Sequence, residues 1–474
     1  MVNPFLKAMS PLAVSYATGF LGERNVWEKQ EKLLKGKLVK LSNVSLGKEL
    51  GASPAGLRKM PITTYKLYQK YFEAPRDGDL LYPVSEYVVA QTSGTMGKPK
   101  KYLIPKTAIA NNMIKTGFAI IVISSHDGDR FTFQLGDVVY TNLAGGSHIT
   151  SHSVSIGRKY TSSFLRQCPD PNLSYREKVN YFVKNYEMID YAQMIVPTLI
   201  DEVYSSIGKP FHLKGFITQD STAEVHKEEI KRITGGYPKV IYGATESLAI
   251  ALPSVEHPGC FFFDWRMSHN EFIPEEERLP YDVGRVDEPP ETVPMMDVEV
   301  GKRYQIVVTP YRTDVTRYAL PDILECVADG DDVLGTSLPV FRYHTRVDRL
   351  ITLHNFTRIA EQEIVQVLED AKIPFVDFVA RREREGTKDY MRLYVELSEQ
   401  MNEAEVFNRI HESFLDFDKD WRDLTNYLEY VPLKLRLLPR GSFRRYLETR
   451  GGMPRVDRVE MRDEFLDRLL GEEP

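Results

Sequence analysis

Hydrophobic and polar positions follow two spacings along the first 345 residues, one typical of strands and one typical of helices. Short runs rich in β-branched and aromatic residues, bounded by turn residues, predict strands at residues 87–90, 101–104, 131–140, 240–242 and 304–309. Apolar residues recur at helical spacing over residues 106–123 and 176–190. Because strands alternate with helices, the pattern predicts an α/β fold.

The pattern changes in the second half of the chain. A proline-rich, acidic stretch at residues 274–294 predicts a surface loop. From Arg346 onward, helical spacing returns, and two apolar runs predict a hairpin around Glu385 and Gly386. The helices are predicted at residues 363–371, 406–417 and 462–470, and the hairpin strands at 375–380 and 391–397. We therefore expect a large domain at residues 1–345 and a small α+β domain at residues 346–474.

Composition narrows the class of protein. The chain has 474 residues, of which 42% are hydrophobic and 27% charged, as expected for a protein with a real core. Its 61 basic and 67 acidic residues give a net charge of −6, and the two signs are interspersed. No dense basic face is therefore expected, which argues against a nucleic-acid partner.

Membrane insertion and secretion are also not expected. The longest apolar run covers residues 117–123, far short of the ~20 residues that a membrane helix needs. The apolar stretch at residues 5–21 is interrupted by polar residues and proline, unlike a signal peptide. The cysteines, Cys168, Cys260 and Cys326, form no cluster, which argues against a zinc site or a disulfide framework. We expect a cytoplasmic protein with reduced thiols.

The most informative segment is TSGTMGKPK at residues 92–100, between two predicted strands. Glycine lets backbone N–H groups approach phosphate oxygens, hydroxyls donate hydrogen bonds, and a lysine adds positive charge. The candidate phosphate-binding residues are Thr92, Ser93, Gly94, Thr95 and Lys98. The spacing is not that of a Walker loop. An ordinary hairpin turn with surface lysines is the alternative interpretation.

This segment resembles the phosphate loop of the acyl-adenylate-forming (ANL) superfamily, whose pattern is close to TSGTTGxPK; Met96 replaces the second threonine. Further along, YGATE at residues 242–246 resembles the YGxTE motif of the same superfamily. The resemblance implies that Tyr242 and Gly243 contribute to nucleotide binding, with the tyrosine packed on adenine. It also implies that Thr245 contacts the α-phosphate and that Glu246 holds Mg²⁺, which carboxylate oxygens suit.

Two more segments follow in the order that the superfamily has. In YALPD at residues 318–322, Asp322 occupies the position of the aspartate that binds the ribose hydroxyls, and Pro321 replaces a glycine. RVDRLI at residues 346–351 resembles the GRxDxxI hinge, with Thr345 in place of the glycine. The resemblance implies that Arg346 contacts the nucleotide and that Asp348 is the pivot between the two domains.

One subfamily matches over a longer span, from about residue 60 to residue 365. The chain resembles the acyl-acid amido synthetases that conjugate auxin and jasmonate to amino acids, and aryl-CoA ligases are more distant cousins. The segments that carry this likeness are PITTY at residues 61–65, PVSE at 83–86, NEFIP at 270–274 and VGKRYQIVVT at 300–309, with a weaker trace at GSF, 441–443.

The resemblance implies a fold and an activity. The fold would be a large adenylate-forming domain with mixed sheets that binds ATP and the acyl substrate, followed by a small mobile lid. The activity would be an ATP- and Mg²⁺-dependent ligase that converts a small carboxylic acid into an acyl-adenylate and passes the acyl group to an amine such as an amino acid. Coenzyme A is the alternative acceptor. An adenylyltransferase and a degenerate nucleotide-binding protein remain open.

Three positions stay ambiguous. Many members of the superfamily carry a lysine near the C-terminus that reaches the α-phosphate, whereas no lysine follows Lys434 in this chain. Arg455 is a candidate replacement, or else a surface residue paired with an acid. His148 and His152 could line the acyl pocket or act on an incoming nucleophile, or be ordinary loop or core histidines. The identity of the acid is not predicted.

Overall fold

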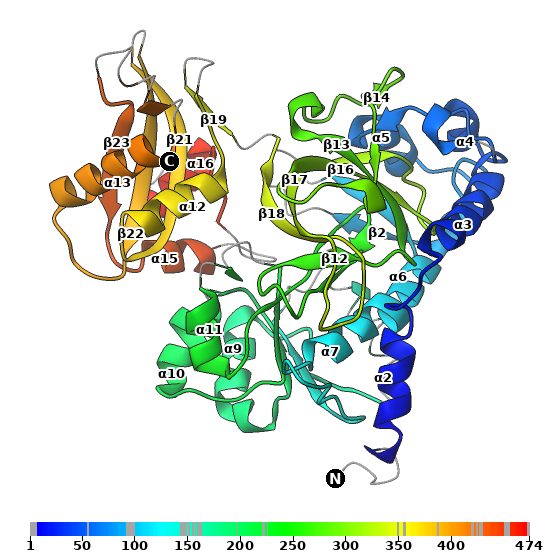
Figure 1. Ribbon diagram of the computed structural model, residues 1–474, viewed down its shortest axis with the longest axis horizontal. Coiled ribbons are helices and arrows are strands. Elements are labelled where there is room, and N and C mark those ends of the chain that lie inside the picture. Colours follow the sequence, from blue (N-terminus) through cyan, green and yellow to red (C-terminus); the bar gives the residue numbers. More distant parts are fainter. Residues whose placement is uncertain are drawn as a thin grey trace. The chain divides into compact units, whose positions relative to one another are not determined.

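The chain folds into two compact units, Met1–Tyr343 and His344–Pro474. The computed structural model describes residues 7–54, 56–91, 100–142, 149, 152–153, 156, 158, 164–196, 198–219, 223–224, 226–347, 350–353, 357–385, 388–418, 421–422, 425, 430–449 and 456–471. Large sheets with helices packed on them confirm the predicted mixed α/β fold class (Figure 1).

A nine-stranded mixed sheet forms the centre of the first unit. Its main path runs β11-β12-β18-β17-β16-β13-β15; β1 joins this path by pairing with β17, and β14 pairs with β1. The strands are β1 (Ile62–Thr63), β11 (Ala251–Pro253), β12 (Phe261–Phe263), β13 (Ser268–Pro274), β14 (Arg285–Val286), β15 (Val293–Pro294), β16 (Arg303–Pro310), β17 (Tyr318–Ala328) and β18 (Val340–Arg346). β16 confirms the strand predicted at residues 304–309, and its nearly continuous burial reflects cover on both faces.

A second sheet of five strands is entirely parallel, in the order β5-β4-β6-β7-β8. Its strands are β4 (Val138–Thr141), β5 (Arg166–Cys168), β6 (Tyr191–Gln193), β7 (Gly215–Thr218) and β8 (Lys239–Val240). Helices α9 (Tyr175–Asn185) and α11 (Lys227–Thr234) lie between strands along the chain, as parallel connections require. A capping box of Ser174 and Glu177 begins α9, which accounts for most of the helix predicted at residues 176–190.

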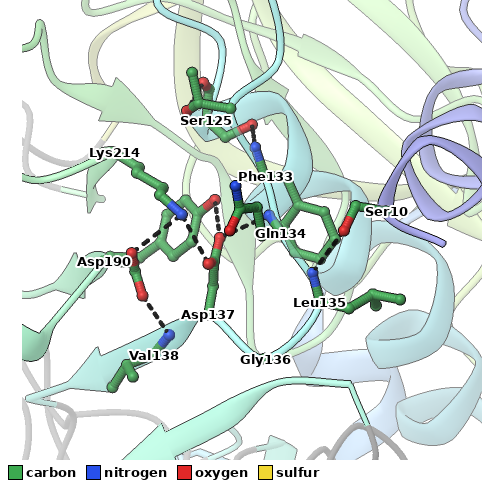
Figure 2. Close-up of polar contacts among 12 residues, drawn as sticks. Ser10, Ser125, Phe133, Gln134, Leu135, Gly136, Asp137, Val138, Asp190 and Lys214 are labelled. Carbon is green, nitrogen blue, oxygen red and sulfur yellow. Dashed lines mark hydrogen bonds and ion pairs between the residues drawn. The ribbon is translucent and has the colours of Figure 1, made fainter. Parts of the chain in front are cut away.

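An ionic cluster joins the amino ends of these parallel strands (Figure 2). Lys214, just before β7, contacts Asp137 at 2.7 Å and Asp190 at 3.1 Å, and these aspartates precede β4 and β6. The backbone N–H of Val138 donates to Asp190, and the hydroxyl of Tyr191 donates to Asp137. The cluster therefore fixes the strands at their amino ends. In such sheets ligands bind at the other edge, outside the carboxyl ends of the strands.

A two-stranded ribbon and a long helix complete the part that positions the site. β2 (Tyr87–Gln91) and β3 (Lys101–Pro105) pair antiparallel, with Gln91 opposite Lys101. They confirm the strands predicted at 87–90 and 101–104, and they make residues 92–100 the connection of a hairpin. The helix predicted at 106–123 is confirmed as α6 (Lys106–Asn112), a π-helical turn η3 (Met113–Gly117) and α7 (Phe118–Ser124).

Among the described residues, one continuous helix, Lys106–Ser124, is long and apolar enough to cross a membrane by length and composition alone. Within the first unit this helix packs on β7, β11 and helix α2 (Ser10–Thr18), and α7 is buried along most of its length. Packing in the core accounts for its apolar composition.

The remaining helices of the first unit precede the ribbon or flank the parallel sheet. They are α3 (Val26–Leu41), α4 (Ser45–Glu49), α5 (Tyr65–Glu73), α10 (Ser205–Ile207) and the π-helix η5 (Thr198–Tyr204). Short 3₁₀ turns lie at Leu57–Lys59, Val84–Glu86, Tyr186–Met188, Glu275–Glu277 and Met295–Asp297.

Three expectations for this unit are wrong in part. The strand expected at 131–140 begins only at Val138, because Gly136 adopts a φ of 93° and turns the chain just before it. β8 ends at Val240 rather than at Tyr242. The stretch at 274–294 is not only loop, because β14 and β15 pair there with distant β1 and β13.

The second unit contains a three-stranded sheet of β21 (Phe375–Glu385), β22 (Lys388–Leu397) and β23 (Leu433–Leu438) and a small ribbon of β19 (Ile351–Leu353) and β20 (Thr357–Ile359). The antiparallel pair β21–β22 confirms the predicted hairpin, with longer strands. The helices are α12 (Glu361–Asp370), α13 (Glu403–Phe417), α15 (Ser442–Glu448) and α16 (Asp463–Leu470). α12, α13 and α16 confirm the three helices predicted from the apolar spacing.

Candidate functional site

Residues from two of the sequence motifs meet in the first unit. The Tyr242 hydroxyl donates a hydrogen bond to Oδ2 of Asp322, at 2.6 Å, although the two residues are 80 positions apart. Glu246 lies four residues after Tyr242, in the turn of the hairpin that follows it. Tyr242, Glu246 and Asp322 are each less than a tenth exposed. Two of the motifs are therefore in contact through Tyr242 and Asp322, and their common nucleotide site stays a prediction.

A tight hairpin holds the YGATE motif in place. Strands β9 (Gly243–Ala244) and β10 (Leu248–Ala249) pair antiparallel, and Thr245 and Glu246 lie in the turn between them. The Ala244 N–H donates to the Ser247 hydroxyl at 3.2 Å. A Cβ on Gly243 would lie 2.4 Å from the Leu248 carbonyl oxygen. Glycine is thus required here for the two strands to approach each other.

Aromatic packing fixes the ring of Tyr242. It stacks on Phe261, with centroids 5.2 Å apart and planes at 12°, and meets the edge of Phe263 at 6.0 Å. Both phenylalanines belong to β12, which is wholly buried. Burial first, and then the charge of Asp322, raise the pKa of Tyr242 well above its usual value, so the hydroxyl remains a donor.

A β-bulge carries Asp322. The register between β16 and β17 shifts between Gln305 and Val307, opposite the part of β17 that contains Pro321. The Gln305 side chain donates to the Leu320 carbonyl at 2.9 Å and accepts from the Leu279 N–H at 2.7 Å. Proline has no N–H to offer a ladder, so a bulge tolerates Pro321 where relatives have glycine.

A pair of buried tyrosines lies next to Glu246. The hydroxyls of Tyr102, on β3, and Tyr318, on β17, are 2.8 Å apart. Burial is the main cause, and the charge of Glu246 the next, of a pKa well above the usual value for both tyrosines. The charge of Glu246 therefore acts on both hydroxyls of this pair. Tyr102 lies just after the TSGTMGKPK segment and Tyr318 is the first residue of YALPD, but the motifs predict no role for either hydroxyl.

Several predicted residues lie outside the described part of the chain. These are Thr92, Ser93, Gly94, Thr95 and Lys98 of the loop, and also Asp348, His148 and Arg455. The structure places only the two ends of the loop, at Gln91 and Lys100. His152 is described, and its Nε2 lies 3.1 Å from the Val89 carbonyl oxygen on β2, the strand that enters the loop.

Arg346 is the last residue of β18 and belongs to the second unit. Its predicted contact with a nucleotide remains a prediction.

Glu246 is the metal-binding residue that the sequence predicts. Among the described residues, no group of three or more His, Cys, Asp or Glu side chains could hold a metal ion. Mg²⁺ commonly takes one or two carboxylates together with substrate phosphates, and Glu246 as one such carboxylate stays a prediction. The three cysteines are free thiols.

Comparison with known proteins agrees with the motifs. Residues 261–343, which include Asp322, match the model of the GH3 family central domain. No curated protein matches the chain.

Solved structures match the whole fold. The acyl acid amido synthetase AtGH3.15, in complex with 2,4-DB, has a TM-score of 0.71 at 14% identity, covering 100% of this chain and 97% of its own. A 2-hydroxyisobutyryl-CoA ligase with 2-HIB-AMP has a TM-score of 0.64 at 16% identity over 94% of this chain and 92% of its own. ATP-bound MatB from Rhodopseudomonas palustris gives 0.52 at 14% identity over 80% and 69%. The predicted resemblance to adenylate-forming enzymes is confirmed in the central segment and in the fold.

Proposed function

We propose that the chain is an ATP- and Mg²⁺-dependent ligase that activates a carboxylic acid as an acyl-adenylate and transfers the acyl group to an amine such as an amino acid. The contact between Tyr242 and Asp322 carries this proposal. It joins the nucleotide-binding motif at residues 242–246 to the ribose-binding aspartate, beside the carboxylate of Glu246. The shared fold of amido synthetases and CoA ligases supports it.

Each residue of the site has a definite task in this reaction. The Asp322 carboxylate can accept hydrogen bonds from two vicinal ribose hydroxyls, and the Tyr242 hydroxyl orients it. Tyr242, backed by Phe261, supplies an aromatic wall for the purine. Glu246 would hold Mg²⁺, which when bound offsets the charge of the phosphates. Thr245 and the loop residues Thr92, Ser93, Gly94, Thr95 and Lys98 would donate to phosphate oxygens as charge develops on them.

The acid then reacts in two half-reactions. Its carboxylate oxygen attacks the α-phosphorus of ATP and pyrophosphate leaves, which yields a mixed anhydride. The amine attacks the acyl carbon, AMP leaves and an amide forms. We propose that residues 1–345 bind ATP and acid, and that residues 346–474 act as a lid that turns at Asp348 and brings Arg346 to the nucleotide. Arg455 is our candidate for the missing lysine.

Coenzyme A is the second candidate acceptor, because one of the structural neighbours described above is named as a CoA ligase. In that case the thiolate, not an amine, attacks the acyl carbon and a thioester forms. We also propose a cytoplasmic location, because free thiols are typical of reducing compartments.

The proposal is tested by acid-dependent ATP–pyrophosphate exchange over a panel of carboxylic acids. Active acids are then incubated with amino acids and with coenzyme A, and the products are identified by mass. We expect exchange with at least one acid and amide formation with an amino acid. Transfer of AMP to an acceptor would indicate an adenylyltransferase, and tight ATP binding without exchange would indicate a degenerate nucleotide-binding protein.

The metal assignment has its own test in Glu246→Gln. The amide keeps the size of the side chain but removes the charge that holds Mg²⁺, so exchange should fall by about a hundredfold or more. A normal thermal unfolding midpoint would confirm that the fold survives. Unaltered exchange in this variant would remove Glu246 from the metal site.

A further inference from the structure

Lys100, the last residue of the TSGTMGKPK segment, is held by three side chains. Its Nζ lies 2.8 Å from Oδ2 of Asp282, 4.9 Å from the ring centroid of Tyr65 and 4.6 Å from that of Tyr281. Lys100 and Asp282 are each about four-fifths buried, with 23% and 20% of their side chains exposed. A carboxylate and two aromatic faces stabilise the charge of an ammonium group and also restrict its position.

Asp282 is itself held in a fixed place. Its Oδ1 accepts a hydrogen bond from the Lys66 N–H at the start of α5, at 2.9 Å. The residue adopts a φ of 51°, which is uncommon for a side chain larger than glycine. Two residues on, the Gly284 N–H donates to the Thr64 hydroxyl at 2.6 Å, and the Thr64 N–H donates to the Gly284 carbonyl at 2.8 Å. The Asp282 turn is thus fastened to residues 64–66.

The same short segment contacts the strand that leaves the loop and leads toward the site. The Lys101 N–H donates to the Tyr65 hydroxyl at 3.0 Å, and the ring of Tyr65 lies 5.1 Å from that of Tyr102. Tyr102 bonds Tyr318, four residues before Asp322. The charge of Asp282 also contributes to the raised pKa of Tyr318, after burial and Glu246, so this cluster borders the site.

Both members of the ion pair are ionised at neutral pH. Burial alone would lower the pKa of Lys100, but Asp282 and Tyr281 outweigh it and hold that pKa above its usual value. Burial alone would raise the pKa of Asp282, but Lys100 and the Lys66 N–H hold it below its usual value. Partly buried charges that stabilise each other in this way are costly to separate.

We propose that Lys100 and Asp282 form a clamp that positions the C-terminal end of the phosphate loop relative to Glu246 and Asp322. Lys100 is then a positioning residue that acts through the loop, and the phosphate contact predicted from the sequence stays assigned to Lys98. This inference rests on the proposed function. The clamp also gives a structural role to PITTY at residues 61–65, which holds the Asp282 turn, and to the stretch at 274–294, which contains Asp282.

The test compares Lys100→Met, Asp282→Asn and the double variant. A clamp predicts that each single variant raises KM for ATP in pyrophosphate exchange by about tenfold, since small misplacement of binding groups has such effects. Because both changes break one contact, the double variant should be no worse than the worse single variant. Lys100→Arg keeps the charge beside Asp282 and should recover most of the affinity. Each single variant should also have a lower thermal unfolding midpoint, because it leaves a partly buried charge without its partner, so KM for ATP is measured well below that midpoint.

Lys70→Met is the matched control. Lys70 also pairs with a carboxylate, Glu49, at 2.8 Å and lies over a tyrosine ring, but it is exposed on α5 and its partners are not those of Lys100. It should leave KM for ATP unchanged.

One pattern of results in these variants would contradict the clamp. If Lys100→Met abolishes exchange through kcat while Asp282→Asn resembles the unchanged protein, Lys100 acts on phosphate directly and the clamp is wrong. ATP binding measured by calorimetry separates the clamp from the proposed function. If the unchanged protein shows no exchange but binds ATP, the ligase proposal fails while the variants still decide the clamp by affinity; if it does not bind ATP, both fail.

Discussion

At the scale of single residues, the proposed nucleotide site depends on the hydrogen bond from the Tyr242 hydroxyl to Asp322. Tyr242→Phe removes the donor and leaves the buried Asp322 carboxylate without it, which typically costs about 1–3 kcal/mol. If this cost falls on the free energy of ATP binding, KM for ATP should rise about tenfold or more, because about 1.4 kcal/mol corresponds to a factor of ten in affinity. Steady-state exchange kinetics and a thermal melt measure both effects.

Tyr140→Phe is the control for this change. The Tyr140 hydroxyl is also buried, but it has no hydrogen-bond partner among the described residues. Removing it should leave ATP affinity unchanged and stability equal or slightly higher. A rise of KM in both variants would mean that the Tyr242 contact is not specific.

Lys37 gives a pH dependence at the same scale. This buried lysine of α3 donates to the carbonyls of Pro310 and Val315, and burial, opposed by Asp314, lowers its pKa from 10.5 to about 7. Between these values the unfolded chain binds a proton that the folded chain does not. Stability should therefore rise from pH 7 toward pH 10, by a few kcal/mol at most.

Urea unfolding at pH 7, 8 and 9 measures this slope. Lys37→Met lacks the titrating group and should show a flatter dependence than the unchanged protein. An identical slope in the two proteins would assign the pH dependence to other groups.

Residue types and their order were enough to predict part of the site. Tyr242 and Asp322 were singled out from short motifs, and they touch. The partner of Lys100 was not predictable, because Asp282 stands in a stretch whose local pattern indicates only loop. The pairing of Tyr102 and Tyr318 was not predictable either, because the sequence around each tyrosine is ordinary for a buried strand. Only the contact of their hydroxyls across 216 positions distinguishes them.

At the scale of elements, the β9–β10 hairpin is the piece that presents Glu246. Gly243→Ala would push a methyl group into the Leu248 backbone and displace the turn. We expect exchange to fall more than tenfold, because a shift of about 1 Å at a catalytic group can cost a hundredfold. Gly236→Ala is the control, since nothing lies within 4 Å of its added Cβ. Equal exchange in both variants would contradict the steric argument.

The cluster at the amino ends of the parallel sheet should affect stability rather than chemistry (Figure 2). Lys214→Met leaves Asp137, whose side chain is 6% exposed, without its cation. Breaking such a pair costs about 3–5 kcal/mol. We expect a clearly lower denaturation midpoint with KM for ATP unchanged in the remaining folded protein. A change of KM without loss of stability would place this cluster near the site.

Local pattern predicted the elements whose partners are near in sequence or whose own periodicity is strong. The long helix at Lys106–Ser124 and the β21–β22 hairpin are examples. It failed where a distant partner decides the structure. β14 consists of two residues that become a strand only because Ile62 lies opposite Val286. No spacing within residues 274–294 could have indicated that partner.

At the scale of the whole molecule, the chain divides into the units Met1–Tyr343 and His344–Pro474 shortly before the hinge-like segment at residues 346–351. If the second unit turns at Asp348 between the half-reactions, restricting the backbone there should affect the two half-reactions unequally. Asp348→Pro restricts φ to about −65°. We expect exchange to persist within about threefold and amide formation to fall about a hundredfold, because only transfer requires the second arrangement.

Asp348→Ala separates the side chain from the backbone in this test. It removes the carboxylate but leaves φ free, so a pivot that works through the backbone should leave amide formation close to normal. Loss of both half-reactions in the proline variant, with a normal melt, would place Asp348 in the adenylation step itself. Equal rates of amide formation in both variants and the unchanged protein would mean that transfer requires no turn at this residue, and the second unit would then contribute Arg346 from one fixed arrangement.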